Sequence, residues 1–148
     1  MRRIHVDAEK CAGCRFCEML CSFHHERKFS SRLSRVRVLK NDKLGLDYPV
    51  ICQQCDSCPP SDVCPTRAFR RTDEGVVRVV RDECVACQRC VASCTFEAVR
   101  IDGSSMPLVC DLCEGDPTCV ERCPTKALEF TETFSAEHRE EAFRRLLR

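Results

Sequence analysis

The sequence predicts an α+β fold of short strands and helices that is held together by its cysteines rather than by a large hydrophobic core. The chain of 148 residues contains 16 cysteines, and its 43% of hydrophobic residues includes them. It has no Trp, one Tyr and eight Phe, which limits the aromatic packing that often anchors a core of this size. The cysteines also recur in a repeated pattern, so they are the expected organisers of the interior.

Four cysteine motifs in series account for every cysteine in the chain. The first motif reads "CAGCRFCEMLC". The motifs consist of Cys11, Cys14, Cys17 and Cys21; Cys52, Cys55, Cys58 and Cys64; Cys84, Cys87, Cys90 and Cys94; and Cys110, Cys113, Cys119 and Cys123. A fourfold repeat with no cysteine left over predicts that the motifs share one kind of chemistry.

The spacing of the cysteines separates the metals that they can bind. Structural zinc sites usually take two close ligand pairs separated by a longer loop, whereas C-x2-C-x2-C-x3-C wraps a 4Fe-4S cluster in bacterial ferredoxins. In two-cluster ferredoxins the fourth cysteine of each run binds the neighbouring cluster. Sixteen cysteines divide into four sets of four, which predicts four 4Fe-4S clusters as cofactors. The alternatives are a structural zinc protein and a disulfide framework, and adjacent C-x2-C-x2-C triplets suit neither.

The first ten residues, "MRRIHVDAEK", contain the pair Arg2-Arg3 but no apolar run of the length that an export signal needs. No stretch approaches the roughly 18 apolar residues of a membrane span. We therefore expect a cytoplasmic protein without a membrane span, in a compartment where thiols stay reduced and can bind metals.

The chain resembles the four-cluster ferredoxin-like electron-transfer subunits that accompany molybdenum or tungsten pterin oxidoreductases. Within that group it is most similar to the iron-sulfur proteins associated with tungsten aldehyde:ferredoxin oxidoreductases. Besides the cysteines, the resemblance rests on "CEMLCSFHHERKFSSRLSRVRVLK", "YPVICQQC" and "CDLCEGDPTCVERCPTKALEF". It implies one domain over residues 1–132, built of tandem dicluster-ferredoxin-like units wrapped around four 4Fe-4S clusters, and a tail at 133–148.

The resemblance also implies how the motifs pair, with the first and last forming an outer unit and the second and third an inner unit. The implied ligand sets are Cys11, Cys14 and Cys17 with Cys123; Cys110, Cys113 and Cys119 with Cys21; Cys52, Cys55 and Cys58 with Cys94; and Cys84, Cys87 and Cys90 with Cys64.

Three positions depart from the pattern of these subunits. In the second motif Pro60 stands where the third cysteine usually falls, and Cys58 comes two residues earlier. We expect a remodelled loop in which Cys58 still binds, because a full cluster would otherwise lack one thiolate. Ser22 and Thr95 replace the proline that often follows the fourth cysteine, which predicts looser turns with the ligands retained.

The connecting segments predict short strands. "RRIHV" at residues 2–6 precedes the first motif, and "AFRRTDEGVVRVV" at 68–80 has the turn residues of a hairpin in its middle. "EAVRI" at 97–101 and "KALEF" at 126–130 follow the third and fourth motifs. The alternating residues of the segment 33–50 predict a second hairpin, which covers one end of the molecule.

Residues 1–45 contain eleven Lys or Arg against five Asp or Glu, although the net charge of the chain is only +1. This excess either compensates negatively charged clusters or forms a docking face for an acidic partner. Nucleic acid is not an expected partner, because the basic residues are scattered and no recognition motif accompanies them. His24 and His25 are interpreted as loop or partner-contact residues, with hydrogen bonding to a nearby cluster as the alternative.

Residues 133–148 predict a C-terminal helix that is capped by Ser135 and has Phe143, Leu146 and Leu147 on one face. The apolar face either packs back on the body or grips another subunit. With clusters placed end to end, this helix motivates the hypothesis that copies of the chain stack head to tail.

Pattern and resemblance together predict an electron carrier that is not itself an enzyme, since no catalytic triad, phosphate loop or dinucleotide fingerprint is present. It would relay electrons between the catalytic subunit of a tungsten or molybdenum pterin oxidoreductase, of the aldehyde oxidoreductase type, and an acceptor such as a flavin, an NAD protein or a ferredoxin. The alternative partner is a hydrogenase, a carbon monoxide dehydrogenase or a dimethyl sulfoxide reductase-like enzyme.

Overall fold

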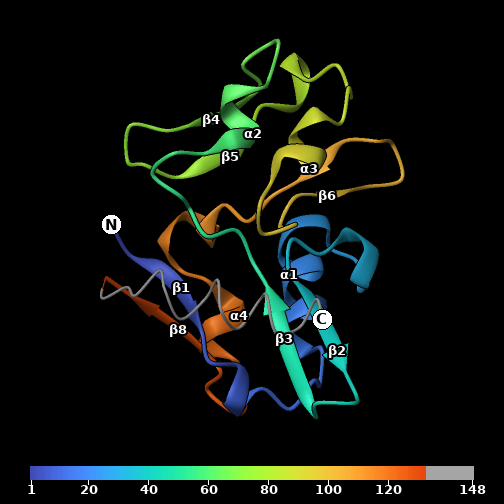
Figure 1. Cartoon of the computed structure of the whole chain (residues 1–148), viewed down its shortest axis with the longest axis vertical. Helices are drawn as coiled ribbons and strands as arrows, with labels where there is room; N and C mark the ends of the chain where they lie inside the picture. Colours follow the sequence, from blue (N-terminus) through green and yellow to red (C-terminus); the bar gives the residue numbers. More distant parts are fainter. Residues whose placement is uncertain (133–148) are drawn as a thin grey trace.

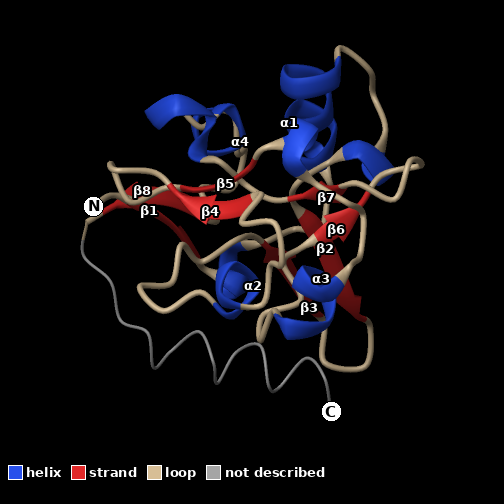
Figure 2. Cartoon of the chain, turned by 90° about the horizontal axis from the view of Figure 1, so that it is seen from above, coloured by secondary structure: helices blue, strands red, loops and turns tan. Residues whose placement is uncertain are grey.

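The computed structural model describes residues 1–132, in which the strands pair as four two-stranded antiparallel sheets with short helices between them (Figures 1 and 2). Short 3-10 helices follow β1, α1, β5 and β7. The elements are β1 (Arg3–Val6), α1 (Phe16–Glu26), β2 (Arg37–Asn41), β3 (Leu46–Val50), α2 (Pro59–Asp62), β4 (Phe69–Arg71), β5 (Val77–Val79), α3 (Arg89–Ser93), β6 (Arg100–Ile101), β7 (Pro107–Leu108), α4 (Thr118–Glu121) and β8 (Leu128–Thr131). The fold is therefore a small α+β architecture, as predicted.

The two ends of the described chain meet in one sheet. Strand β1 pairs with β8, so that Ile4 lies opposite Phe130 and Val6 opposite Leu128. Ile4, Val6 and Leu128 are buried in the larger hydrophobic core. Because the first motif follows β1 and the last motif precedes β8, this pairing brings two motifs together that are far apart in the sequence.

The segment 33–50 forms the predicted hairpin. Strand β2 pairs with β3, with Val38 opposite Pro49, and Val36, Val38, Tyr48 and Val50 are buried in the larger core. The hairpin lies in the same half of the molecule as β1, β8 and α4 (Figure 1).

The other predicted hairpin, β4–β5, lies in the opposite half with α2 and α3 (Figure 1). Phe69 and Val77 of this hairpin pack with Val99 and Val109, which flank the short β6–β7 pair, in a second and smaller core. The described chain thus has two hydrophobic cores, and cysteines pack against both of them.

Helix α1 is longer than the sequence pattern suggested. It continues past Cys21 to Glu26, so that His24 and His25 lie in its last turn and not in a loop as expected. The residues before it keep the loop geometry of the motif, because Arg15 adopts a left-handed conformation with φ of 59°.

Ser22 explains this extension and corrects the expectation of a looser turn. Its fully buried hydroxyl donates to the carbonyl of Met19 at 3.0 Å and accepts the N–H of Ser30 at 3.1 Å. A proline at this position would remove one backbone N–H from the helix and clash with its preceding turn. Serine therefore lets the helix continue where the related motifs turn.

No helix in the stretch 1–132 has both the length and the apolar character needed to cross a membrane. The predicted C-terminal helix, with Ser135, Phe143, Leu146 and Leu147, lies outside the described residues.

Candidate metal centres

All sixteen cysteines lie within the described residues, and none of them forms a disulfide. The structure therefore argues against the disulfide framework that the cysteine content alone allows. Cys17, Cys21, Cys110 and Cys119 are buried, and Cys14 and Cys87 are exposed. The thiols thus occupy positions from the interior to the surface.

One backbone turn recurs in all four motifs, at the residue immediately before the second cysteine. This residue has a positive φ in every case, of 61° at Gly13, 51° at Gln54, 54° at Ala86 and 61° at Leu112. Residues other than glycine rarely adopt this conformation, and it is retained where the surrounding structure requires it, often at functional sites. The four loops are therefore curled in the same way, each around its own cysteines.

A second turn recurs after the fourth cysteine of the last three motifs. In each, the N–H three residues later donates to the carbonyl of the cysteine. The donors Arg67, Glu97 and Lys126 lie 3.3, 3.0 and 3.3 Å from the carbonyls of Cys64, Cys94 and Cys123. Thr95 stands in this turn where the other two have proline, and the hydrogen bond is retained, so the predicted loosening at Thr95 does not occur.

Two of the four implied ligand sets each line a small cavity. Cys11, Cys14, Cys17 and Cys123 line the first, which lies between the opening loop and the residues that lead into β8. Burial, followed by the charges of Asp47, Cys14 and Cys123, raises the pKa of Cys11. Three cysteines of the first motif and the last cysteine of the chain therefore line the same cavity.

The second cavity is lined by Cys64, Cys84, Cys87 and Cys90 together with Phe69 and Val79 of the β4–β5 hairpin. Burial, and to a smaller extent the charges of Cys84 and Cys87, raises the pKa of Cys90 to about 11.

Cys58, whose position departs from the pattern, lies with the other members of its implied set. Burial and the charges of Cys58, Cys94 and Cys55 raise the pKa of Cys52 to about 12. The local remodelling is visible: α2 begins directly after Cys58 with Pro59 as its first residue, and the Cys58 carbonyl accepts the N–H of Ser61 at 2.8 Å. Proline is well suited to the first turn of a helix, because its missing N–H has no partner there.

The remaining cysteines, Cys21, Cys110, Cys113 and Cys119, gather beside α1 and α4. Burial and then the charges of Cys21 and Cys113 raise the pKa of Cys119, and burial followed by the Asp111 and Cys21 charges raises that of Cys113 to about 12. The thiols within this set and within the set of Cys52 therefore lie near one another, and Cys110 and Cys119 also lie near Cys52 and Cys17 of other sets.

Three of the four cysteines that end a motif have pKa values below the ordinary thiol value. Burial opposes this shift, but hydrogen-bond donors outweigh it. Arg35 donates its N–H to Sγ of Cys21 at 3.3 Å, and Phe69 donates to Sγ of Cys64 at 3.4 Å. The N–H groups of Leu128 and Ala127 and the hydroxyl of Thr125 lower the pKa of Cys123. Such donors stabilise a thiolate and tune a cluster that it binds.

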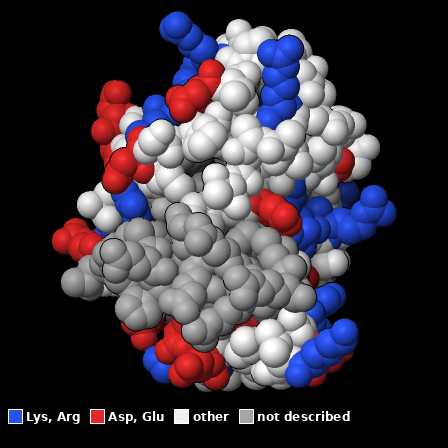
Figure 3. Space-filling view, viewed as in Figure 1, with Lys and Arg blue, Asp and Glu red and all other residues white. Residues whose placement is uncertain are grey.

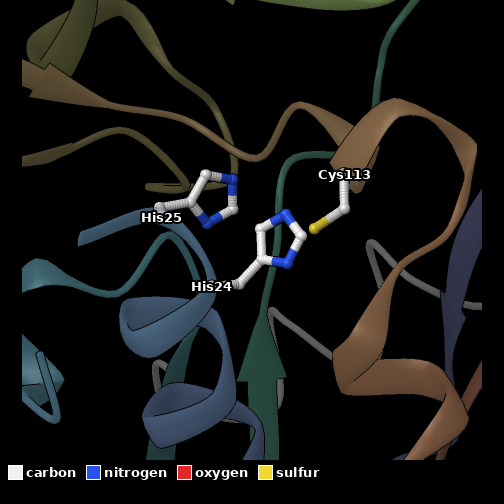
Figure 4. Close-up of side chains that lie close together, drawn as sticks. All are labelled: His24, His25 and Cys113. Carbon is white, nitrogen blue, oxygen red and sulfur yellow. The ribbon is translucent and has the colours of Figure 1, made fainter. Parts of the chain in front are cut away.

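His24 and His25 approach Cys113 at the end of α1 (Figure 4), and potential ligand atoms of the three residues lie within 4.8 Å of one another. His25 is held from two sides: Nδ1 lies 2.9 Å from the carbonyl of Cys21, and Nε2 lies 3.0 Å from Oδ1 of Asp111. Burial lowers the pKa of His25, but hydrogen bonds to Asp111 and Cys21 raise it to about 10. Sequence reasoning missed Asp111, whose position directly after Cys110 was the available signal.

Ion pairs engage some of the basic residues of the N-terminal segment. Five of them are in ion pairs with carboxylates, and Lys and Arg stand among Asp and Glu on the exposed, coloured part of the face in Figure 3. These pairs are Arg3–Asp56, Lys10–Asp7, Arg35–Glu26, Arg37–Glu97 and Lys40–Asp47. Five of the eleven basic residues of this segment are thus paired with carboxylates of the chain itself.

The donor sets fit iron-sulfur chemistry. Four thiolates complete the coordination of a 4Fe-4S cluster, and raised thiol pKa values mean that binding metal must displace protons. Four thiols also fit zinc, so the ligand atoms alone do not separate the two metals. The curled loops with inward N–H groups are, however, typical of iron-sulfur sites.

No protein-family model matches the chain. Curated proteins do match it. The chain is 39% identical over 141 residues to YsaA of Escherichia coli (strain K12), a protein named for electron transport, covering 86% of this chain and 88% of the relative. It is 38% identical over 122 residues to the polyferredoxin-like subunit of the aliphatic sulfonate oxidoreductase of Pyrococcus furiosus, covering 81% of this chain and 70% of the relative.

Among solved structures, the chain matches one in the active site complex BamBC of benzoyl coenzyme A reductase bound to benzoyl-CoA. The TM-score is 0.55 with 29% sequence identity, and the match covers 99% of this chain and 89% of that one.

Proposed function

This chain belongs to the family of polyferredoxin-like iron-sulfur electron transport proteins, and on that premise we propose that it relays electrons through four 4Fe-4S clusters between the catalytic subunit of an oxidoreductase and a redox acceptor. The observation that carries the proposal is that the four cysteine motifs share one curled turn and that two of the implied ligand sets each line a small cavity. A single cluster would suffice for transfer over a short distance, whereas four serve to span a longer one.

We propose the ligand sets that the motif pairing implies. The outer unit would hold one cluster on Cys11, Cys14, Cys17 and Cys123 and a second on Cys21, Cys110, Cys113 and Cys119; the inner unit would hold one on Cys52, Cys55, Cys58 and Cys94 and another on Cys64, Cys84, Cys87 and Cys90. The two cavities, one lined by the first of these sets and one by the last, support this division. A 4Fe-4S cluster supplies a one-electron redox couple at each of these positions.

The two hydrophobic cores support an order for the sets. Cys17, Cys21, Cys110, Cys119 and Cys123 belong to or pack against the larger core. The smaller core is contacted by Cys64 and Cys90. Cys52 and Cys94 pack against both. We therefore place the set of Cys52 and Cys94 between the outer unit and the set that contains Cys64 and Cys90.

The side chains and backbone of this protein would set the properties of each site. Burial of Cys17, Cys110 and Cys119 removes water from the outer unit, and the backbone N–H groups that point at Cys21 and Cys64 stabilise negative charge on sulfur. Burial and N–H donors act in opposite directions on a cluster potential, so the sites need not be equivalent.

The sequence resemblance supports a tungsten or molybdenum pterin oxidoreductase as the catalytic partner, with a flavin, an NAD protein or a ferredoxin as the acceptor. The polyferredoxin-like subunit of the Pyrococcus sulfonate oxidoreductase and the BamBC complex support the general role of a subunit beside a catalytic chain. Location in the cytoplasm and head-to-tail association of copies stay predictions.

Metal analysis tests the proposal. The native complex would be purified without oxygen through a tag on this chain, and iron, zinc, tungsten and molybdenum would be counted together. We expect about sixteen iron atoms per chain, four for each cluster, with tungsten or molybdenum present. Full iron without either metal would move the partner to a hydrogenase or another enzyme class, and zinc in place of iron would overturn the proposal.

A further inference from the structure

Gln54, which lies between Cys52 and Cys55, joins two parts of the molecule. Its side chain is fully buried, and Nε2 donates to the carbonyl of Cys110 at 2.7 Å. Oε1 of the same amide accepts the N–H of Val77 at 2.7 Å. One glutamine thus satisfies a backbone acceptor of the last motif and a backbone donor of β5.

The main chain of Gln54 is fixed as well. Its φ of 51° belongs to the recurring turn of the motifs, and its carbonyl accepts a hydrogen bond from Arg71 at 3.4 Å. A buried amide with both ends bonded has little freedom to move, because each broken bond would leave an unpaired polar group in the interior. Both partners of the side-chain amide are backbone groups.

The contacts of Gln54 connect two different thiol sets. Cys110 belongs to an outer ligand set and is buried in the larger core. Cys52 belongs to an inner ligand set and packs against both cores. The hydrogen bond from Gln54 to the Cys110 carbonyl holds the loop that carries Cys52 and Cys55 against the last motif. Gln54 therefore links the loop of an inner set directly to a residue of an outer set.

We propose that Gln54 is the positioning residue of the junction between the two middle clusters: by tying the Cys52–Cys55 loop to Cys110, it fixes the separation across which an electron passes from one half of the chain to the other. This inference rests on the proposed function. One electron leaves the reduced site and enters its neighbour, which is reduced by one electron, and no bond forms or breaks.

Gln53 offers a matched control in the next position. It is also a buried glutamine, with 4% of its surface exposed, but its Nε2 donates only to the nearby carbonyl of Ile51 at 2.6 Å. Replacing Gln53 perturbs the same loop at a buried position without removing a hydrogen bond to the last motif.

The test compares Gln54→Met, Gln54→Glu and Gln53→Met in the full chain, purified without oxygen. Methionine fills similar volume but bonds to neither partner. Glutamate keeps an acceptor for the Val77 N–H and loses the donor to the Cys110 carbonyl. Three readouts are followed: iron content, hydrogen exchange at the Val77 amide, and the magnetic interaction between reduced clusters in the electron paramagnetic resonance spectrum.

We expect full iron in all three variants and, in Gln54→Met, roughly tenfold faster exchange at Val77, as follows from losing one hydrogen bond. Both Gln54 variants should lose part of the splitting that reports inter-cluster interaction, while Gln53→Met keeps the wild-type spectrum. If Gln54→Met takes up no iron, the spectrum of Gln54→Glu is compared with that of Gln53→Met instead.

Unchanged splitting in iron-replete Gln54 variants would overturn the junction role and leave the electron-transfer function intact. Equal changes in Gln53→Met would overturn it too, as would failure of both Gln54 variants to bind iron, since either result would indicate a general folding role. Absence of iron from the wild-type protein would instead contradict the proposed function itself.

Discussion

His25 and Asp111 form an ion pair between residues 86 positions apart, with Nε2 of His25 lying 3.0 Å from Oδ1 of Asp111. Nδ1 of the same ring contacts Cys21, at 2.9 Å from its carbonyl and 3.8 Å from Sγ. Asp111 in turn accepts the N–H of Cys113 at 3.1 Å. The pair therefore connects the end of the first motif to the beginning of the last, within one proposed ligand set.

Removing either member of this pair should destabilise the loaded protein. His25→Phe removes the imidazole from the Asp111 carboxylate, and Asp111→Ala leaves Nε2 of the ring without its acceptor, so we expect each to cost about 1–3 kcal/mol. The double variant should cost less than the sum of the two, because the residues act on each other. The measurement is the rate at which guanidinium bleaches the iron-sulfur absorption, with His5→Phe on β1 as the control. Additive effects would show that the two side chains act independently.

Glu18 should support the packing of α1 against β2 through one hydrogen bond. It is 2% exposed, and its carboxylate accepts the N–H of the buried Val38 at 2.7 Å. Glu18→Ala leaves that N–H unpaired and should cost about 1–3 kcal/mol, whereas Glu18→Gln keeps an acceptor and should retain most of the stability. Thermal bleaching of the two variants under anaerobic conditions makes the comparison. If glutamine is as harmful as alanine, the charge of Glu18 matters more than its hydrogen bond.

Arg100 should hold in place the loop that contacts Cys21. Its Nη1 donates to the carbonyls of Ser31 at 2.6 Å and Ser34 at 3.2 Å, and the next residue, Arg35, donates its N–H to Sγ of Cys21. Arg100→Met removes these donors, so hydrogen exchange at the Arg35 amide should accelerate roughly tenfold for each hydrogen-bond equivalent lost. The measurement is amide exchange followed by mass spectrometry or NMR.

Arg70→Met is the matched control for Arg100. Arg70 is half-exposed and pairs with Glu83 at the surface, where such ion pairs contribute little. Its replacement should leave exchange at Arg35 unchanged. Acceleration by both variants would point to a general loss of stability rather than to the loop.

Cys58 should be a ligand despite its displaced position. Cys58→Ala removes one thiolate from the set that it forms with Cys52, Cys55 and Cys94. We therefore expect a loss of about one to four iron atoms per chain, depending on whether a three-iron cluster survives. Ser57→Ala alters the neighbouring side chain and should keep full iron. The measurement is iron content together with the resonance spectrum of the oxidised protein. Full iron in Cys58→Ala would mean that another group binds in its place.

Local sequence patterns alone determined much of the secondary structure and the protein family. The hairpins at 33–50 and 68–80 and the strands around the motifs form as predicted, because alternation and turn residues act over a few positions. The count and spacing of the cysteines likewise led to the iron-sulfur electron transport family, which the curated relatives support. Spacing within a motif fixes how far its thiols lie apart, so a single stretch of sequence carries that information.

Only the tertiary structure decided how the motifs and their supporting residues meet. The extension of α1 through Ser22 depends on a hydrogen bond from Ser30, and the roles of Gln54 and Asp111 depend on partners 56 and 86 positions away. No local pattern encodes such contacts, because they exist only once β1 has paired with β8 and the two cores have formed. The cysteines could be counted in the sequence, but their neighbours across the fold follow from packing.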